Sequence, residues 1–199
     1  MRFLTLAGLL LLMAGCTGLP PRPVPESAQQ SWTLRQQELK QIDGWQLKGR
    51  VAIVNGVEAW HLNVNWLQND GDYRIEMWGP FGAGRVQLRG NEQGVRLIDS
   101  DQYVYYSTDP ESLLYEHTGV KMPVAGLRYW ILGLADPGQS QKQPVVDRYG
   151  RLASVQQNAW NVELQRYTRV GQMELPDKLS VNKDDLRVKM VVDNWKLKH

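Results

Sequence analysis

The residues that most often carry enzyme chemistry are few and scattered in this sequence. Its three histidines are His61, His117 and His199, and no two of them have the His-x-x-x-His spacing of a helical metal site. Cys16 is the only cysteine, so neither a disulfide within one molecule nor a thiolate metal cluster can form. The sequence also lacks a Gly-x-Ser-x-Gly elbow, a phosphate loop and any distinctive pairing of acidic residues. We therefore predict a protein that is not an enzyme and that uses no metal or cofactor.

Cys16 has a different chemistry open to it, because it ends a leader. The first sixteen residues, MRFLTLAGLLLLMAGC, place one basic residue before an apolar run and small residues before the cysteine, which is typical of a secretory signal peptide. The apolar run is shorter than the about 20 residues that a membrane-spanning helix needs. The ending Met13-Ala14-Gly15-Cys16 resembles the bacterial lipobox, with Met13 in place of the commoner leucine. We expect lipidation of Cys16; the alternative is an ordinary leader with an incidental thiol.

The chain after the leader divides into a tether and one domain. Residues 17–26, TGLPPRPVPE, contain four prolines and should extend by ~3.1 Å per residue, which keeps a globular body clear of the membrane. We therefore predict a signal peptide at 1–15, a lipidated cysteine and tether at 16–26, and a single domain at 27–199. The formal charge of +2 comes from charges of mixed sign and does not indicate a nucleic-acid partner.

Alternating apolar residues predict a mainly β domain. In Trp60–Trp66, WHLNVNW, the apolar side chains fall on one face and the polar ones on the other. Looser alternation occurs at 45–53, 73–77, 86–88, 95–97, 103–105, 160–164 and 186–192. Turn sequences such as NGVE and NDGD separate these segments, which favours an antiparallel meander.

Three segments predict helices. Residues 27–42 have a thin apolar stripe, with Ser27 as a possible N-cap and Gly44 just past the end, and DPESLLYEHTG at 109–119 has a capping Asp-Pro and a closing glycine. Residues 123–133 are apolar on nearly all sides and should be buried against the sheet. A strongly curved sheet covered by this last helix satisfies both patterns, with either a solid core or a ligand cavity inside.

The turn GPFGAG at 79–84 carries the only phenylalanine outside the leader. Its glycines have the wrong spacing for a dinucleotide site, and it joins two strand patterns rather than opening a helix. Phe81 either folds back into the core, which would contribute about 1.5–3 kcal/mol, or projects from the turn. The residue pattern alone leaves both open.

Several of these features together resemble the LolB family of outer-membrane lipoprotein receptors. They are the lipobox, the proline-rich tether, the strand sequence 49–66, the turn at Phe81 and LRYWILGL at 127–134. The resemblance continues through Met122-Pro123 and LRVKMVVDNW at 186–195, and it covers most of the mature chain. It implies an incomplete, half-open antiparallel β-barrel with a helical lid over a hydrophobic cavity, the LolA/LolB-like fold.

The resemblance also implies a function and partners. Members of the family accept acylated lipoproteins from the periplasmic carrier LolA and insert them into the inner leaflet of the outer membrane of a Gram-negative bacterium. The expected partners are therefore LolA, acylated lipoprotein cargo and outer-membrane phospholipid, and we expect a lipid-anchored monomer that faces the periplasm. Thr17, where an aspartate would signal retention in the inner membrane, agrees with this location.

The resemblance assigns roles to particular residues. The family's turn carries a protruding hydrophobic residue needed for membrane insertion, usually leucine in Asn-Pro-Leu-Gly, and the matching residues here are Gly79, Pro80, Phe81 and Gly82. From the alternation we place the acyl-chain cavity at Trp60, Leu62, Val64, Trp66, Ile75, Met77, Val86, Leu127, Trp130, Ile131 and Leu134. The basic side chains near the barrel rim that would meet an acidic carrier surface are Lys48, Arg50, Arg85 and Arg89.

Blander interpretations of the same residues stay open. The apolar set would also form an ordinary packed core, and the basic set would also lie on solvated strand faces. Two other functions remain as alternatives: a lipid-anchored carrier of a small hydrophobic ligand, and a lipoprotein that scaffolds an envelope complex. A scaffold with a solid interior would bind no apolar probe, whereas the other two would.

Overall fold

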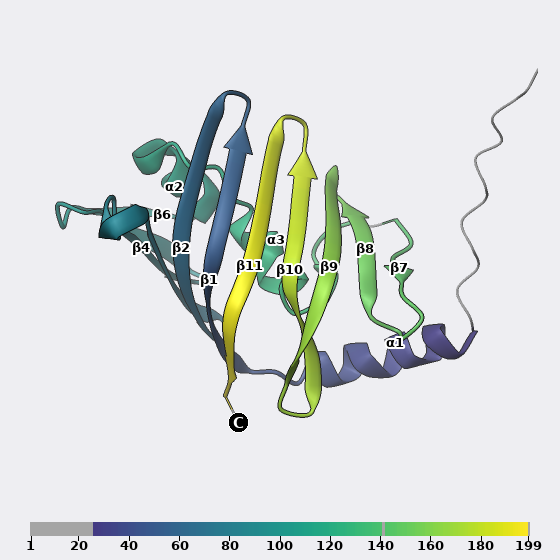
Figure 1. The fold of residues 1–199 in the computed structure, drawn as a ribbon. Helices are drawn as coiled ribbons and strands as arrows, with labels where there is room; N and C mark the ends of the chain where they lie inside the picture. Colours follow the sequence, from purple (N-terminus) through teal and green to yellow (C-terminus); the bar gives the residue numbers. More distant parts are fainter. Residues whose placement is uncertain (1–25, 141, 199) are drawn as a thin grey trace, which may run out of the picture.

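The computed structural model describes residues 26–140 and 142–198. The predicted signal peptide, Cys16 and the tether up to residue 25 therefore lie outside the described residues. Within them, the chain forms one antiparallel sheet of eleven strands with helices α1 (Glu26–Leu39), α2 (Pro110–Thr118) and α3 (Val124–Trp130). Figure 1 views the sheet with α2 and α3 behind it and α1 across one end.

The strands follow one another across the sheet in the order β6-β5-β4-β3-β2-β1-β11-β10-β9-β8-β7. Because this order is linear, the edge strands β6 and β7 are not paired with each other in the described part of the chain. The sheet is curved but open, which confirms the predicted incomplete barrel. The strands are β1 (Gly44–Asn55), β2 (Glu58–Asn69), β3 (Asp72–Trp78), β4 (Val86–Asn91), β5 (Gly94–Ile98), β6 (Val104–Ser107), β7 (Val145–Val146), β8 (Leu152–Gln157), β9 (Trp160–Val170), β10 (Met173–Lys183) and β11 (Leu186–Leu197).

The alternation in the sequence sets the two faces of the sheet. In β2, Val64 and Trp66 are buried, whereas the alternating residues Asn63 and Asn65 are only half-buried. Trp66 lies opposite Leu47 of β1, which is also buried, so the apolar side chains of neighbouring strands meet on one face. That face is concave and carries the core.

Two helices cover the concave face. In α3, Leu127 and Trp130 are completely buried, as is Ile131 directly after it. In α2, Asp109 accepts a hydrogen bond from the Glu111 amide at the N-cap. At the other end, Gly119 takes the left-handed conformation that closes the helix. Both helices were expected; α3 ends at Trp130 rather than at 133.

The first helix and three strands, β7, β8 and β10, differ from the sequence-based expectation. Helix α1 begins at Glu26 and ends at Leu39, so Ser27 lies inside the helix and is not its N-cap. Its expected apolar stripe is present, because Ala28, Trp32 and Leu39 are buried. Strands β7, β8 and β10 were not expected. In β10, Pro176 interrupts the alternation, and the pairing with β9 shifts register between Pro176 and Leu179.

The described residues form one large hydrophobic core. Its buried cluster runs from Trp32 to Val192 and draws on the helices and on strands from both halves of the sheet. We therefore expect a chain that begins at Thr17, without the lipidated cysteine, to fold. None of the helices in residues 26–140 and 142–198 is both long enough and apolar enough to cross a membrane.

Candidate functional site

The turn between β3 and β4 carries the most exposed large apolar side chain described. Phe81 is fully exposed, at 108% of its reference area, in the short 3₁₀ turn η1 (Pro80–Gly82). Its φ of 57° and ψ of 17° lie in the left-handed region, which a bulky residue rarely adopts and which costs of order 1 kcal/mol. The alternative in which Phe81 folds into the core is therefore wrong for this structure.

Backbone hydrogen bonds and a stacked pair hold this turn in shape. The Gly79 amide donates to the Ala83 carbonyl at 2.7 Å, and the Ala83 amide donates to the Pro80 carbonyl at 3.2 Å. At the base of the turn, the Arg85 guanidinium lies 4.9 Å from the ring centre of Trp78. Phe81 therefore projects from a turn that backbone hydrogen bonds hold together.

The residues predicted to line an acyl-chain cavity come together on the concave face. Eight of the eleven belong to the hydrophobic cluster formed by the sheet and the helices, and the other three pack against it. Trp60, Leu62 and Val86 are half-buried and pack against the cluster. The others are buried within it: Val64, Trp66, Ile75, Met77, Leu127, Trp130, Ile131 and Leu134. The buried side chains of α3, together with Ile131 and Leu134, fill this interior. Helix α3 therefore covers the concave face as a closed lid.

A buried glutamine ties the lid to strand β8. Gln157 is completely buried, and its side-chain oxygen accepts from the Trp130 indole N–H at 2.8 Å and from the Asp136 amide at 2.9 Å. Its side-chain nitrogen donates to the Asp136 carbonyl at 2.8 Å. Gly126 allows this arrangement, because a Cβ there would lie 2.4 Å from the Trp130 ring. We call this set of contacts the Gln157 clamp.

Two pockets flank α3. One, of about 360 Å³, lies before its N-terminus, where Met122, Trp160 and Leu186 meet the charged side chains of Glu111 and Lys183. Burial there raises the pKa of Glu111. The other, of about 300 Å³, lies along the helix beside Trp66 and Tyr129. Each is at the lower end of the about 300–1,000 Å³ typical of sites for one small ligand. A ligand larger than one small molecule would therefore enter only if α3 moved.

The four basic residues of the predicted carrier contact lie on the outer, convex side of the sheet. Lys48, Arg50 and Arg85 are exposed and Arg89 is half-buried. Arg50 is engaged by Asp193, whose carboxylate accepts from its guanidinium at 2.8 Å. Arg85 lies 3.9 Å from Glu76. Lys48 is separated from Arg89 by β2 and β3, so the structure does not gather all four into one cluster.

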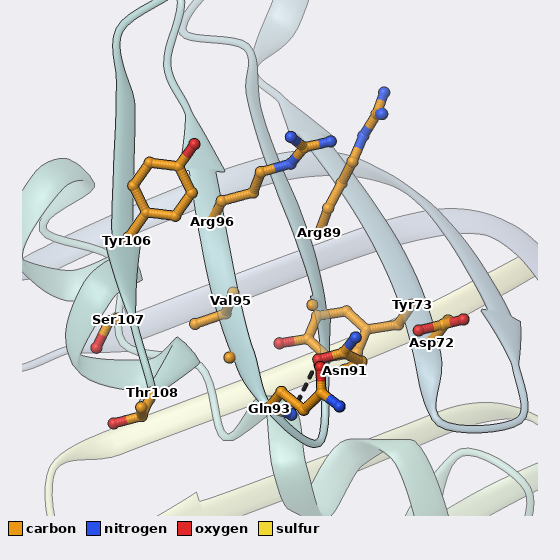
Figure 2. A pocket seen from close by; sticks show the side chains of 12 residues that line it. Asp72, Tyr73, Arg89, Asn91, Gln93, Val95, Arg96, Tyr106, Ser107 and Thr108 are labelled. Atoms are coloured by element: carbon orange, nitrogen blue, oxygen red, sulfur yellow. Dashed lines mark hydrogen bonds between the residues drawn. The ribbon is translucent and has the colours of Figure 1, made fainter.

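Arg89 belongs to a row of three arginines that the sequence did not reveal. It lies opposite Arg74 on β3 and opposite Arg96 on β5. Figure 2 shows Arg89, Arg96 and Tyr106 on three neighbouring strands, projecting to the same side around an open pocket of about 750 Å³. Like charges directly opposite one another on a sheet are destabilising, which makes this row suited to an anionic partner.

Comparison with known protein families gives a match over most of the domain. The family model described as "Outer membrane lipoprotein LolB" matches residues 43–195. The chain is 36% identical over 188 residues to the outer-membrane lipoprotein LolB of Nitrosococcus oceani, covering 94% of each chain. It is 34% identical over 197 residues to LolB of Pseudomonas aeruginosa, covering 98% of this chain and 96% of the relative.

Solved structures with low sequence identity share the fold. A DUF1329 family protein from Desulfovibrio piger superposes with a TM-score of 0.58 at 9% identity, covering 88% of this chain and 94% of that one. A LolA superfamily protein from Nitrosomonas europaea superposes with a TM-score of 0.50 at 8% identity, covering 86% of this chain and 94% of that one. An open antiparallel sheet with helices on its concave face is therefore shared well beyond recognisable sequence similarity.

Proposed function

Since the chain belongs to the LolB family of outer-membrane lipoproteins, we propose that it receives acylated lipoproteins from the soluble carrier LolA and inserts them into the inner leaflet of the outer membrane. The observation that carries this proposal is Phe81, fully exposed on a turn whose backbone is strained at that residue. Neither burial nor backbone preference favours an aromatic side chain there. Contact with lipid would explain this exposed side chain, because aromatic rings are favoured at the membrane interface.

The concave face is suited to acyl chains. Each methylene group kept out of water contributes about 0.8 kcal/mol, so a triacylated cargo needs an apolar surface throughout its transfer. The interior contributes Trp66 and Met77 from the sheet and Leu127 from α3. In this proposal the side chains of α3, Ile131 and Leu134 move away from the sheet, and the acyl chains of the cargo occupy the space that they leave. The transfer runs downhill, because the receptor holds the chains more tightly than the carrier does and the membrane holds them more tightly still.

The carrier contact is proposed on the outer face. Lys48, Arg89 and Arg96 present positive charge that would steer an acidic carrier surface. Arg50, Arg74 and Arg85 are expected to contribute less, because each lies within 4.0 Å of a carboxylate.

A handover assay tests acceptance and insertion separately. LolA loaded with a labelled lipoprotein is mixed with the chain from Thr17 onward and then with liposomes. We expect Phe81→Glu to accept cargo as well as the wild type does but to deliver at least tenfold less of it, because a carboxylate at the tip opposes entry into the interface. Leu34→Glu is the matched control, since Leu34 is 62% exposed on α1, at the other end of the sheet (Figure 1).

The outcomes separate the candidate functions. Equal delivery by wild type and Phe81→Glu would show that the tip has no role in insertion. If neither protein accepts cargo from a competent carrier, the receptor proposal fails. A titration with a fluorescent fatty acid then distinguishes a small-ligand carrier, which binds it, from a scaffold, which does not.

A further inference from the structure

A second feature of the outer face lies next to the Phe81 turn. A groove of about 520 Å³ crosses strands β2, β1, β11 and β10, and Pro80 of the turn forms part of its wall. Its floor is low because Ala52 and Val191 are small side chains at the centre of the sheet. Around them stand His61, Arg50, Lys178 and Lys189.

The strand register explains why these side chains converge. Ala52 lies opposite His61 on one side and opposite Lys189 on the other. One step along the strands, Val191 lies opposite both Arg50 and Lys178. Each small residue is therefore flanked by two longer polar or basic ones, and the four point to the same side of the sheet.

Among the described residues, Lys178 and Lys189 form no ion pair with a carboxylate. The nearest carboxylates along their strands are Asp177 and Asp193, and each already accepts hydrogen bonds from an arginine, Arg166 and Arg50 respectively. Within residues 26–140 and 142–198, neither Lys178 nor Lys189 has a carboxylate within 4.0 Å. Both side chains are exposed. Among the residues that the structure describes, the groove thus has two lysines without a carboxylate partner above an apolar floor.

We propose that this groove binds the phosphate of an anionic phospholipid headgroup in the membrane that receives the cargo. The inference rests on the proposed function, because it uses Phe81 to fix the height of the protein at the membrane. Pro80 directly precedes Phe81 and forms part of the groove wall, so one end of the groove lies next to the residue assigned to the interface. Phosphates lie at that level, and lysine binds phosphate as a point charge.

A lipid occupant fits this groove better than the carrier does. The groove is continuous with the turn that would touch lipid, because Pro80 forms part of its wall, whereas none of the three arginines of the row on β3 to β5 lines it. A headgroup held here would orient the concave face, with its cargo, at a fixed angle to the bilayer. An acidic surface of the carrier is the competing occupant, and the experiment below distinguishes the two.

The test measures vesicle binding of the chain from Thr17 onward by flotation. The vesicles contain phosphatidylethanolamine with increasing fractions of phosphatidylglycerol. We expect wild-type binding to rise with phosphatidylglycerol and to fall with salt. The double variant Lys178→Gln/Lys189→Gln should bind about 30-fold less at the highest fraction, since each lysine near an anionic surface contributes about 1 kcal/mol.

A charge-matched double variant, Lys40→Gln/Lys142→Gln, controls for net charge. Both of its lysines are exposed, one directly after α1 and one before β7, and neither lines the groove. Binding of the control should fall less than threefold. An equal loss in both double variants would mean that only net charge matters and would overturn the proposal, as would unchanged binding of Lys178→Gln/Lys189→Gln.

Two further measurements distinguish a headgroup site from membrane insertion by Phe81 and from a contact with the carrier. Titration with monomeric short-chain phosphatidylglycerol, followed by NMR at Ala52 and Val191, needs no insertion, so it detects the headgroup site even if Phe81 does not enter the bilayer. Shifts at these residues that disappear in Lys178→Gln/Lys189→Gln support the site. If that variant instead keeps its vesicle binding and loses acceptance of cargo from LolA, the groove belongs to the carrier and the proposal is wrong.

Discussion

Substitution of Gln157 by methionine tests whether the clamp fixes the lid. Methionine has nearly the same length and volume, so little space changes, but it neither accepts nor donates a comparable hydrogen bond. The change leaves three buried groups without their partner: the Trp130 indole N–H, the Asp136 amide and the Asp136 carbonyl. We expect a large loss of stability from a single uncharged side chain.

The magnitude follows from the three hydrogen bonds. A buried polar group left without its partner costs about 1–3 kcal/mol, so the three together cost roughly 3–9 kcal/mol if the site does not relax or admit water. The whole free energy of unfolding of a domain is about 5–15 kcal/mol. With a urea m-value of about 2 kcal/mol per molar, the unfolding midpoint should fall by about 1.5–4.5 M.

Urea unfolding followed by tryptophan fluorescence measures this loss. Gln156→Met is the matched control, because Gln156 is the neighbouring residue on β8, is only half-buried and should lose less than about 0.5 kcal/mol. A loss below about 1 kcal/mol in Gln157→Met, or one equal to that of the control, would refute the reasoning. Partial opening of the lid should also strengthen binding of a fluorescent fatty acid, because a larger fraction of molecules is then competent to bind.

Two further predictions concern stability. Burial raises the pKa of Tyr73 to about 12, above the about 10 of an unfolded tyrosine, so the folded state keeps a proton that the unfolded state loses. Stability should therefore be full below pH 10 and fall by about 1–2 kcal/mol between pH 10 and 12, allowing for partial exposure of the ring; urea titrations across this range should show a smaller fall in Tyr73→Phe, and an identical fall would contradict it. Gly49→Ala should cost about 1–3 kcal/mol, because the new Cβ would lie 2.3 Å from the Val191 carbonyl oxygen, whereas Gly71→Ala, whose Cβ meets nothing closer than 3.8 Å, should unfold at nearly the wild-type urea concentration.

The parts of the fold that the sequence predicts are those with regular alternation. Trp60 to Trp66 lies in β2, and 186–192 lies in β11, because the apolar positions of both face a buried surface. Strand β10 escapes such reasoning, since Pro176, Asp177 and Lys178 break its alternation at a bulge. Its place beside β11 is set by long-range pairing, which local patterns do not record.

The candidate site was predictable in its apolar part and not in its polar part. The concave-face residues follow from alternation, and the position of Phe81 follows from its turn residues and from the family resemblance. Gln157 lies in a strand that the sequence did not indicate, and its partners are 21 or more positions away. The convergence of Lys178 and Lys189 depends on the register of three strands. No local sequence pattern predicts these long-range contacts.

The central position of the β1–β11 pair has a consequence for how the chain folds as it is made. β1 pairs with β2 on one side, but its partner on the other side is β11, the last strand of the described chain, where Trp45 pairs with Leu197. The hairpins on either side can form from local segments, but the join between the two halves closes a loop of nearly the whole domain. Until the last dozen residues are available, each half has an unpaired central edge and an exposed apolar face, which would make the growing chain a client for holdase chaperones.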